Sequence, residues 1–151
     1  MDFITGLPDI NGVNALLVCV DKFGTLSQLI LCRAGENELS APAIAKLFFE
    51  NVVHLYGVSH VVLHDRDPRF TAAFWKELWK ILSCKTVFLS TFYLQTDSQK
   101  ERHNHTIEKV VQALGHEHGL SWMESIPLVE MMLNNVVNDS TRMSPAFVSY
   151  G

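Results

Sequence analysis

Three acidic residues of this chain, Asp2, Asp65 and Glu101, have the side-chain chemistry and sequence context expected of ligands for divalent metal ions. Asp2 falls in a predicted strand, Asp65 at the end of another, and Glu101 at the start of a predicted helix. Phosphoryl transfer with two metal ions needs hard anionic oxygens around ions about 3.5–4 Å apart. Mg²⁺ binds a few carboxylates together with water and substrate phosphate, so three acids are enough. We therefore predict that these three carboxylates converge on a metal site that acts on the phosphodiesters of DNA.

Each of the three acids also has a simpler interpretation when it is considered alone. Glu101 follows Ser98 with the S-x-x-E spacing of a capping box. Asp65 is placed to cap the helix after it, and Asp2 is placed to be a solvated acid near the start of the chain. Taken singly, these structural roles are favoured. The metal-site hypothesis depends on the combination of all three acids.

The first part of the chain predicts a small sheet that would carry Asp2. Residues 2–7, 13–20 and 26–32 are rich in Ile, Val, Leu and Phe, which is typical of strands. Asn11-Gly12 favours a tight hairpin turn, and residues 21–24 provide the second turn. Strands joined by short turns are antiparallel, so this part predicts an antiparallel meander.

The rest of the chain predicts helices with two further strands between them. The first helix begins at Ser40 and stops at Gly57, with an apolar stripe of Ile44, Leu47, Phe48, Val52 and Leu55. Residues 58–63 and 85–89 predict strands, and a helix between them carries Phe74, Leu78, Ile81 and Leu82 on one face. Helices are also predicted over residues 99–117 and 121–137, followed by a tail over 141–151 without periodicity. This order predicts an α/β, ribonuclease-H-like fold: a mixed five-stranded sheet, three antiparallel strands then βαβ crossovers, with helices on both faces.

The predicted helix 99–117 has a polar face that includes Glu101. At 100° per residue, Glu101 shares this face with His105, Glu108 and Gln112. The opposite face carries an apolar stripe of Ile107, Val110, Val111 and Leu114. We therefore expect Glu101 to project outward, where a metal ion can reach it.

Composition favours a single soluble globular domain. Of the 151 residues, 48% are apolar and 19% are charged, and the longest apolar run, residues 15–20, is far too short to span a membrane. The chain start lacks the features of a signal peptide, so we expect an intracellular protein. The net charge of −4 argues against strong phosphate binding, but eight of the twelve Lys and Arg residues lie between positions 66 and 109. The three cysteines are predicted to be buried, reduced thiols.

Several motifs resemble the integrase catalytic core of gypsy-type long-terminal-repeat retrotransposons. They are residues 1–8, 18–23, 64–70 and 74–75, Gln95-Thr96-Asp97 with Glu101, Arg102 and Asn104, and Asn134-Asn135, Ser140-Thr141, Met143-Ser144-Pro145 and Tyr150-Gly151. Thirty-five residues separate Asp65 from Glu101, which is the D,D-35-E spacing of retroviral and retrotransposon integrases. The resemblance extends over essentially all 151 residues.

The resemblance implies an enzyme that processes the 3′ ends of retroelement DNA and joins them to host DNA. It implies Asp2, Asp65 and Glu101 as catalytic residues and ligands of two Mg²⁺ or Mn²⁺ ions. It further implies a homo-oligomer, at least a dimer, that acts in the nucleus on element ends and target DNA, without a membrane. We expect residues 1–151 to be one catalytic core domain that lacks the start of its first strand. The positions expected to face DNA are Gln95, Gln99, Lys100, Arg102, Asn104 and His105.

The chain departs from the family pattern near the expected site. His64 stands where Ser is common, Tyr93-Leu94-Gln95 where His-Pro-Gln is common, and Ser98 replaces a Gly. His105 stands where an Arg is frequent. Loss of Pro at 94 and Gly at 98 changes the backbone freedom of this loop. The changes that give Tyr93, Leu94, Ser98 and His105 can each be a single transition of the cytosine-deamination kind, which suggests a decaying copy with its three acids intact. Two other functions therefore stay open: a catalytically silent, integrase-derived DNA- or protein-binding domain, and a ribonuclease-H-like nuclease.

Overall fold

The structure is a computed structural model, and it describes residues 1–35, 39–58, 62, 72–82, 105–111, 121–139 and 141–151. The chain divides into two compact units. One consists of Met1–Asp2 and Arg33–Thr96, and the other of Phe3–Cys32 and Asp97–Gly151. Across the described residues, no helix is both long enough and apolar enough to cross a membrane.

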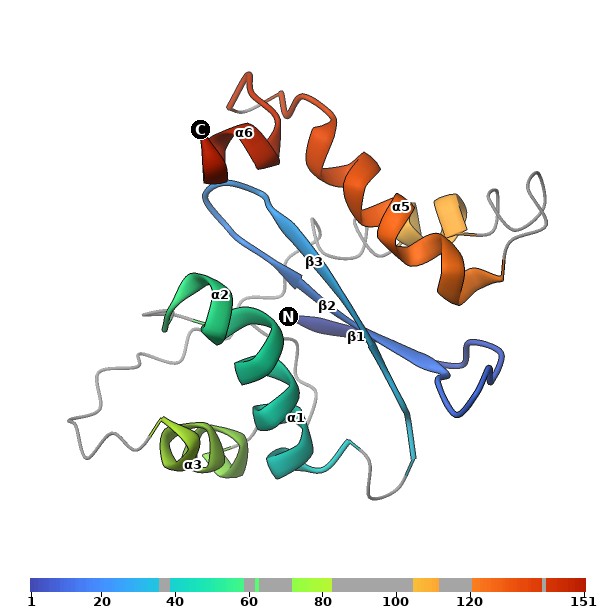
Figure 1. Cartoon of the computed structure of the whole chain (residues 1–151), viewed down its shortest axis with the longest axis vertical. Helices are drawn as coiled ribbons and strands as arrows, with labels where there is room; N and C mark the ends of the chain where they lie inside the picture. The colour runs from blue at the N-terminus through green and yellow to red at the C-terminus, as the bar shows by residue number, and fades with distance from the viewer. Residues whose placement is uncertain (36–38, 59–61, 63–71, 83–104, 112–120, 140) are drawn as a thin grey trace. The chain divides into compact units, whose positions relative to one another are not determined.

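Three strands form a sheet in the order β1 (Asp2–Ile4), β2 (Ala15–Val20) and β3 (Ser27–Cys32), as Figure 1 shows. The strands β2 and β3 pair antiparallel, with a register from Ala15 opposite Cys32 to Val20 opposite Ser27. Two of the three predicted strand ranges therefore agree closely with the structure. The first strand is shorter than predicted, because it ends at Ile4 and Gly6 follows with φ +81°, which extended backbone does not adopt.

The predicted Asn-Gly turn is confirmed, within the connection from β1 to β2. Ile10 and Val13 form an isolated bridge with backbone hydrogen bonds of 2.9 and 3.0 Å. Asn11 and Gly12 have φ values of 53° and 84°, as a type I′ turn requires at both central positions. The side chain of Asp9 accepts a hydrogen bond of 3.0 Å from the N–H of Gly12, which stabilises the turn.

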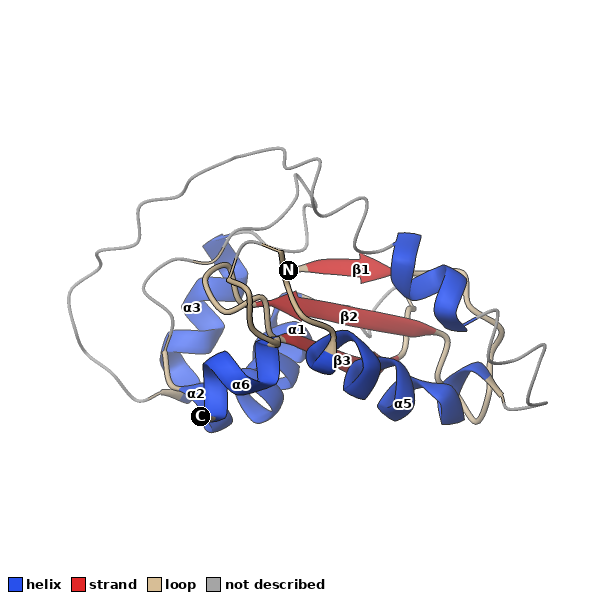
Figure 2. Cartoon of the chain, turned by 90° about the horizontal axis from the view of Figure 1, so that it is seen from above, coloured by secondary structure: helices blue, strands red, loops and turns tan. Residues whose placement is uncertain are grey.

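The core of this second unit is one hydrophobic cluster. Its buried members are Ile4, Leu16, Val18, Leu29, Ile107, Val111, Trp122, Ile126 and Val129. They come from the three strands, from residues 105–111, which are helical, and from α5 (Trp122–Asn135). In Figures 1 and 2, α5 lies along β3. The predicted helix 121–137 is thus confirmed, and it begins with a complete capping box between Ser121 and Glu124.

The end of the chain is helical, which corrects the prediction of a tail over 141–151. The helix α6 (Pro145–Tyr150) packs against α5. Ser144 caps it by accepting a hydrogen bond of 3.3 Å from the N–H of Phe147, and Pro145 occupies the first helical position. Six residues are too few for a helical apolar period to be recognised. The sequence signal for this helix was its start, Ser144 followed by Pro145.

A tight connection joins α5 to α6. The N–H of Arg142 donates to the carbonyl of Asn138 at 2.8 Å, and the N–H of Asn138 donates to the carbonyl of Met143 at 3.0 Å. Arg142 has φ +58°, a left-handed conformation that is costly for a residue with a Cβ. The side-chain amide of Asn138 donates to Thr25 Oγ1 at 3.1 Å, which ties the connection to the β2–β3 turn.

In the first unit, a continuous helical stretch consists of α1 (Ala41–Phe48), a π-helical segment (Phe49–Val53) and α2 (His54–Tyr56). The N–H of His54 donates to the carbonyl of Phe49, five residues earlier. This wider turn rotates the side chains after it, so Val53 is buried and Leu55 is 56% exposed. The prediction that Leu55 belongs to the buried stripe was therefore wrong.

The helix α3 (Ala72–Ile81) packs against α1 through aromatic rings. Phe48 and Phe74 meet edge to face at 6.0 Å between ring centroids, and Phe74 meets Trp75 at 5.1 Å. Phe74 and Leu78 are buried as predicted, whereas Ile81 is exposed. Of the predicted strand 58–63 only residues 58 and 62 are described, and 85–89 lies outside the described residues.

Candidate functional site

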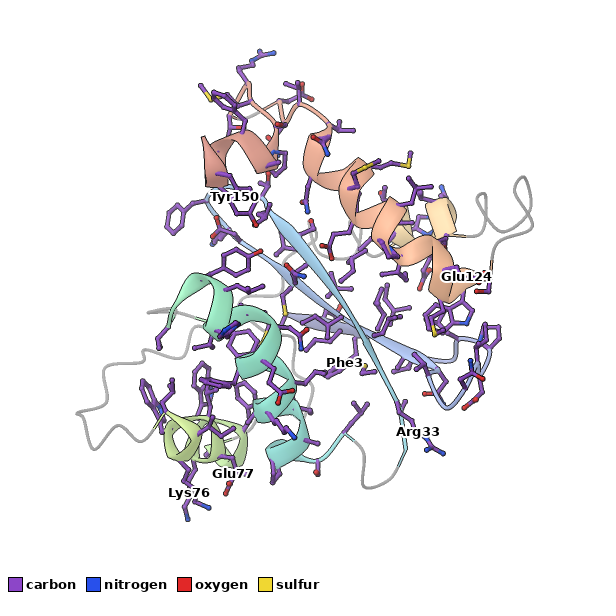
Figure 3. The ribbon with its side chains drawn as sticks, viewed as in Figure 1. Phe3, Arg33, Lys76, Glu77, Glu124 and Tyr150 are labelled. Carbon is purple, nitrogen blue, oxygen red and sulfur yellow. The ribbon has the colours of Figure 1, made fainter. Side chains whose placement is uncertain are left out.

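Asp2, one of the three acids, is the first residue of β1, and its side chain is half-buried. Side chains alternate between the two faces of a strand, so Asp2 lies on the same face as Ile4. Phe3, labelled in Figure 3, belongs to the other face of the strand. Ile4 is a buried member of the hydrophobic cluster. Burial of Ile4, the next residue on the same face, therefore anchors the strand that begins with Asp2.

The remaining acids lie outside the described residues. This applies to Asp65 and Glu101, and also to Gln95, Gln99, Lys100, Arg102 and Asn104. Within the described ranges, no three His, Cys, Asp or Glu side chains gather as metal ligands would. The predicted convergence of residues 2, 65 and 101 stays a prediction.

The helical residues 105–111 confirm the described part of the predicted two-faced helix. Ile107 and Val111 are buried, and Val110 is half-buried. His105 and Glu108 are exposed, as expected for the face assigned to Glu101. His105 therefore has access to a partner in solution.

The strand β1 and the helical residues 105–111 share one packed core. Ile4 comes from β1, Ile107 and Val111 come from the helical stretch, and all three belong to the cluster that contains Trp122. A well-packed core resists relative displacement of the elements that contribute to it. The element that carries Asp2 and the helical stretch a few residues after Glu101 are thus held by the same side chains.

A polar anchor that sequence reasoning did not identify joins α5 to the outer edge of β3. Asn134 Oδ1 accepts from the N–H of Ser27, and Asn134 Nδ2 donates to the carbonyl of Ser27, both at 2.8 Å. One turn earlier, Glu130 Oε2 accepts from the N–H of Leu29 at 2.6 Å. The sequence signal that could have revealed this anchor is the pair Glu130 and Asn134, two polar residues four positions apart in a largely apolar helix.

The environment of Glu130 opposes its negative charge. Desolvation by burial raises the pKa of this carboxyl above its ordinary value of 4.5, and the hydrogen bond from the Leu29 backbone lowers the pKa in part. Glu130 therefore has a structural role, because its carboxylate accepts the hydrogen bond from the Leu29 N–H of β3.

A second contact that sequence reasoning missed holds the connection between β1 and β2. Trp122 Nε1 donates a hydrogen bond of 2.8 Å to the carbonyl of Pro8. Trp122 is 9% exposed and is therefore a core residue. An indole N–H in a core needs an acceptor, and here the acceptor is a backbone carbonyl 114 residues away in sequence.

Cys19 does not have the properties of an activated nucleophile. Cys19 is buried, and desolvation raises the pKa of its thiol to about 12. A thiol with such a pKa stays protonated at neutral pH, whereas reactive cysteines have depressed pKa values. Cys32 is half-buried, and Cys84 lies outside the described residues. The prediction of buried, reduced thiols is confirmed for Cys19.

Comparisons with known proteins give a consistent result at the levels of sequence and fold. No family model matches the chain. The chain is 34% identical over 145 residues to the Transposon Tf2-3, Tf2-4 and Tf2-5 polyproteins of Schizosaccharomyces pombe (strain 972 / ATCC 24843). These matches cover 96% of this chain but 11% of each polyprotein, so the chain corresponds to a small part of such relatives.

One solved structure similar to the chain is the HTLV-2 integrase catalytic core domain in complex with magnesium, in a trimeric form. The match has a TM-score of 0.64 and 16% sequence identity, and it covers 97% of this chain and 93% of that chain. At this level of identity the likeness concerns the fold. The predicted ribonuclease-H-like fold class is thereby confirmed, while the described sheet contains three of the five predicted strands.

Proposed function

Because the chain belongs to the retroviral-type integrase cores, we propose that it catalyses DNA integration by polynucleotidyl transfer. In the proposed reaction, water first cleaves near the 3′ end of a retroelement DNA. The freed 3′-hydroxyl then attacks a phosphodiester of host DNA in the nucleus. The observation that carries this proposal is 34% identity to transposon polyproteins over 96% of a chain that retains Asp2, Asp65 and Glu101.

We propose that Asp2, Asp65 and Glu101 together hold two Mg²⁺ or Mn²⁺ ions. The donor set fits, because Mg²⁺ prefers carboxylate oxygens, and Asp2 begins a strand whose next same-face residue is buried. The magnesium complex of the HTLV-2 core supports a divalent ion. When bound, the two ions activate the attacking oxygen and stabilise the leaving oxygen. The protein's own part is to keep the three carboxylates ionised and oriented.

The polar residues around Glu101 are proposed to hold DNA in place. Lys100 and Arg102 would contact phosphates, which fixes the position of the duplex without reading its sequence. Gln95, Gln99, Asn104 and His105 would add hydrogen bonds from the same region. The exposure of His105 supports this role for the described end of the segment.

Self-association is proposed through the outward face of α5. Leu128, Met131 and Met132 are 36%, 53% and 44% exposed, and their spacing places them on one stripe of α5. The buried face of α5 is a separate stripe with Trp122, Ile126 and Val129. A helix with two apolar faces has one face left for a partner. The trimeric form of the HTLV-2 core supports a second copy of the chain as that partner.

The alternative function is a catalytically silent domain that binds DNA or protein. The substitutions at positions 94, 98 and 105 relative to the family pattern favour this alternative. Retention of all three acids favours the enzyme.

The two functions are separated by incubating the purified chain with Mn²⁺ and a branched DNA that mimics the joined product. An integrase core is expected to reverse the joining reaction and release the two DNA products. Glu101→Gln is expected to abolish this release, because an amide is a poor ligand for a hard cation. Glu108→Gln, which changes an exposed acid on the same helical stretch, is the matched control and should retain activity. A folded chain without activity in Mn²⁺ would support the binding module.

A further inference from the structure

The connection between β1 and β2 is anchored to α5 at a defined point. Residues 5–14 contain the hairpin turn at Asn11-Gly12, and Pro8 lies between that turn and β1. The carbonyl of Pro8 accepts the hydrogen bond of 2.8 Å from Trp122 Nε1. Leu7 and Ile10, the apolar residues on either side, pack against the cluster that contains Trp122. The connection therefore has both a directional bond and apolar contacts with the start of α5.

The donor of this bond is itself fixed. Trp122 is the first residue of α5, and Ser121 caps the helix by accepting from the N–H of Glu124 at 3.3 Å. Glu124 Oε2 accepts in return from the N–H of Ser121 at 3.0 Å. A capping box defines the backbone path into the first turn, so the indole has little freedom to follow a shift of Pro8.

Directionality separates this hydrogen bond from the packing around it. Apolar contacts are non-directional, so the cluster opposes displacement of β1 without fixing the direction of any single contact. A hydrogen bond weakens steeply when its distance or angle changes. The strand β1 has three residues and is hydrogen-bonded to β2 in the sheet, and the bond at Pro8 adds a directional restraint just beyond its end.

We propose that Trp122 is a positioning residue for Asp2. Through the carbonyl of Pro8 it fixes the connection that follows β1, and with Ile4 and Ile107 it fixes β1 against the helical residues 105–111. This inference rests on the proposed function, because it assigns Trp122 a role in keeping the Asp2 carboxylate in the geometry that binds a divalent cation.

Thermodynamic linkage makes the proposal measurable without catalysis. If the bond from Trp122 to Pro8 favours the metal-binding geometry, then metal binding must favour the bond by the same factor. Mg²⁺ should therefore slow hydrogen exchange of the Trp122 Nε1–H.

The first experiment compares Trp122→Phe with Ile126→Val in the 151-residue chain. Phenylalanine keeps a ring in the cluster but cannot donate to Pro8, whereas Ile126→Val removes one methylene from the same cluster and leaves the bond intact. Calorimetric titration with Mg²⁺ should show an affinity about two- to tenfold weaker for Trp122→Phe, the range expected for one hydrogen bond. Ile126→Val should retain the affinity of the unsubstituted chain. Equal losses in the two variants would overturn the proposal, because packing alone would then explain them.

The second experiment follows the indole resonance of Trp122 by NMR during the same titration. Saturating Mg²⁺ should slow exchange of its Nε1–H in the unsubstituted chain but not in Asp2→Asn. Binding of Mg²⁺ with no change at Trp122 would overturn the positioning role and leave the proposed function standing. Absence of Mg²⁺ binding by the folded chain would overturn both.

Discussion

Asn134 takes the place of a neighbouring strand for Ser27. Its side-chain amide accepts from the Ser27 N–H and donates to the Ser27 carbonyl, each at 2.8 Å, although the two residues are 107 positions apart. An Asn side chain carries both an acceptor and donors, so it reproduces the pair of bonds that a backbone would offer. Ser27 is 1% exposed, so water does not replace these bonds.

Asn134→Ala is accordingly expected to destabilise the chain. It removes two hydrogen bonds at the buried Ser27 backbone, and loss of a hydrogen bond to a buried group costs about 1–3 kcal/mol. The midpoint of urea unfolding, followed by circular dichroism, measures this loss. Asn135→Ala is the control, because Asn135 is exposed and its amide donates to the Met131 carbonyl of its own helix. Equal midpoints for the two variants would contradict the role of Asn134.

Glu130→Gln is expected to stabilise the chain at neutral pH. Glutamine still accepts from the Leu29 N–H but carries no charge into a half-buried position. Because the folded state raises the pKa of Glu130 above 4.5, the contribution of Glu130 to stability is fully present below that pH. This contribution is lost as the pH rises through the folded pKa.

The gain from Glu130→Gln should therefore be present at pH 7, below about 1 kcal/mol after solvent screening. It should shrink as the pH falls towards 4.5. Melting temperatures measured as a pH series test this trend. A gain that grew on acidification would show that the sign is wrong.

Arg142→Gly is expected to raise stability by up to about 1 kcal/mol. Arg142 has φ +58°, where glycine avoids the steric cost of a Cβ, although glycine also loses more entropy on folding. Arg142→Ala controls for loss of the side chain, since alanine keeps the Cβ at this φ. Urea unfolding of the two variants should place glycine above alanine; the reverse order would mean that the backbone is unstrained.

Met131→Asp is expected to weaken self-association. Met131 is 53% exposed on the outward stripe of α5, and a carboxylate there would have to be desolvated in an interface. Sedimentation velocity over a range of protein concentrations measures the assembly. Phe23→Asp is the control, because Phe23 is 88% exposed in the turn between β2 and β3 and is not part of α5. If Phe23→Asp alone dissociates the assembly, the interface lies elsewhere.

His105→Arg is expected to strengthen DNA binding. The side chain is exposed at the first described helical position, and an arginine there adds a charge for one more phosphate. The slope of log affinity against log salt should then become steeper by about 1. Fluorescence anisotropy with labelled duplex DNA measures both values, and His105→Gln serves as the neutral control. An unchanged slope would place His105 away from DNA.

The features predicted well from sequence are those encoded by neighbouring residues. Asn11-Gly12 specifies its turn through two residues that tolerate positive φ. The spacing of Ile107 and Val111 specifies which helix face is buried. The prediction of an apolar stripe failed at Leu55, because the π-helical turn over Phe49–Val53 changes the 3.6-residue period that the prediction assumes.

Contacts between distant residues could not be predicted in this way. The bonds from Asn134 to Ser27 and from Trp122 to Pro8 join residues more than one hundred positions apart. Their partners are backbone atoms, which every residue possesses, so no side-chain pattern marks them. For the candidate site, the three acids were identified by type and spacing, and the structure describes Asp2 alone among them.

The side chains of Glu130 and Asn134 also bear on how the protein behaves at high concentration. An open sheet margin is a template on which identical molecules stack into fibrils. Here side chains of α5 accept hydrogen bonds from the backbone N–H groups of Ser27 and Leu29 in β3. A foreign strand would first have to displace this helix before it could pair with β3. Fibril growth from this margin is thereby discouraged without a proline or a lysine in the strand itself.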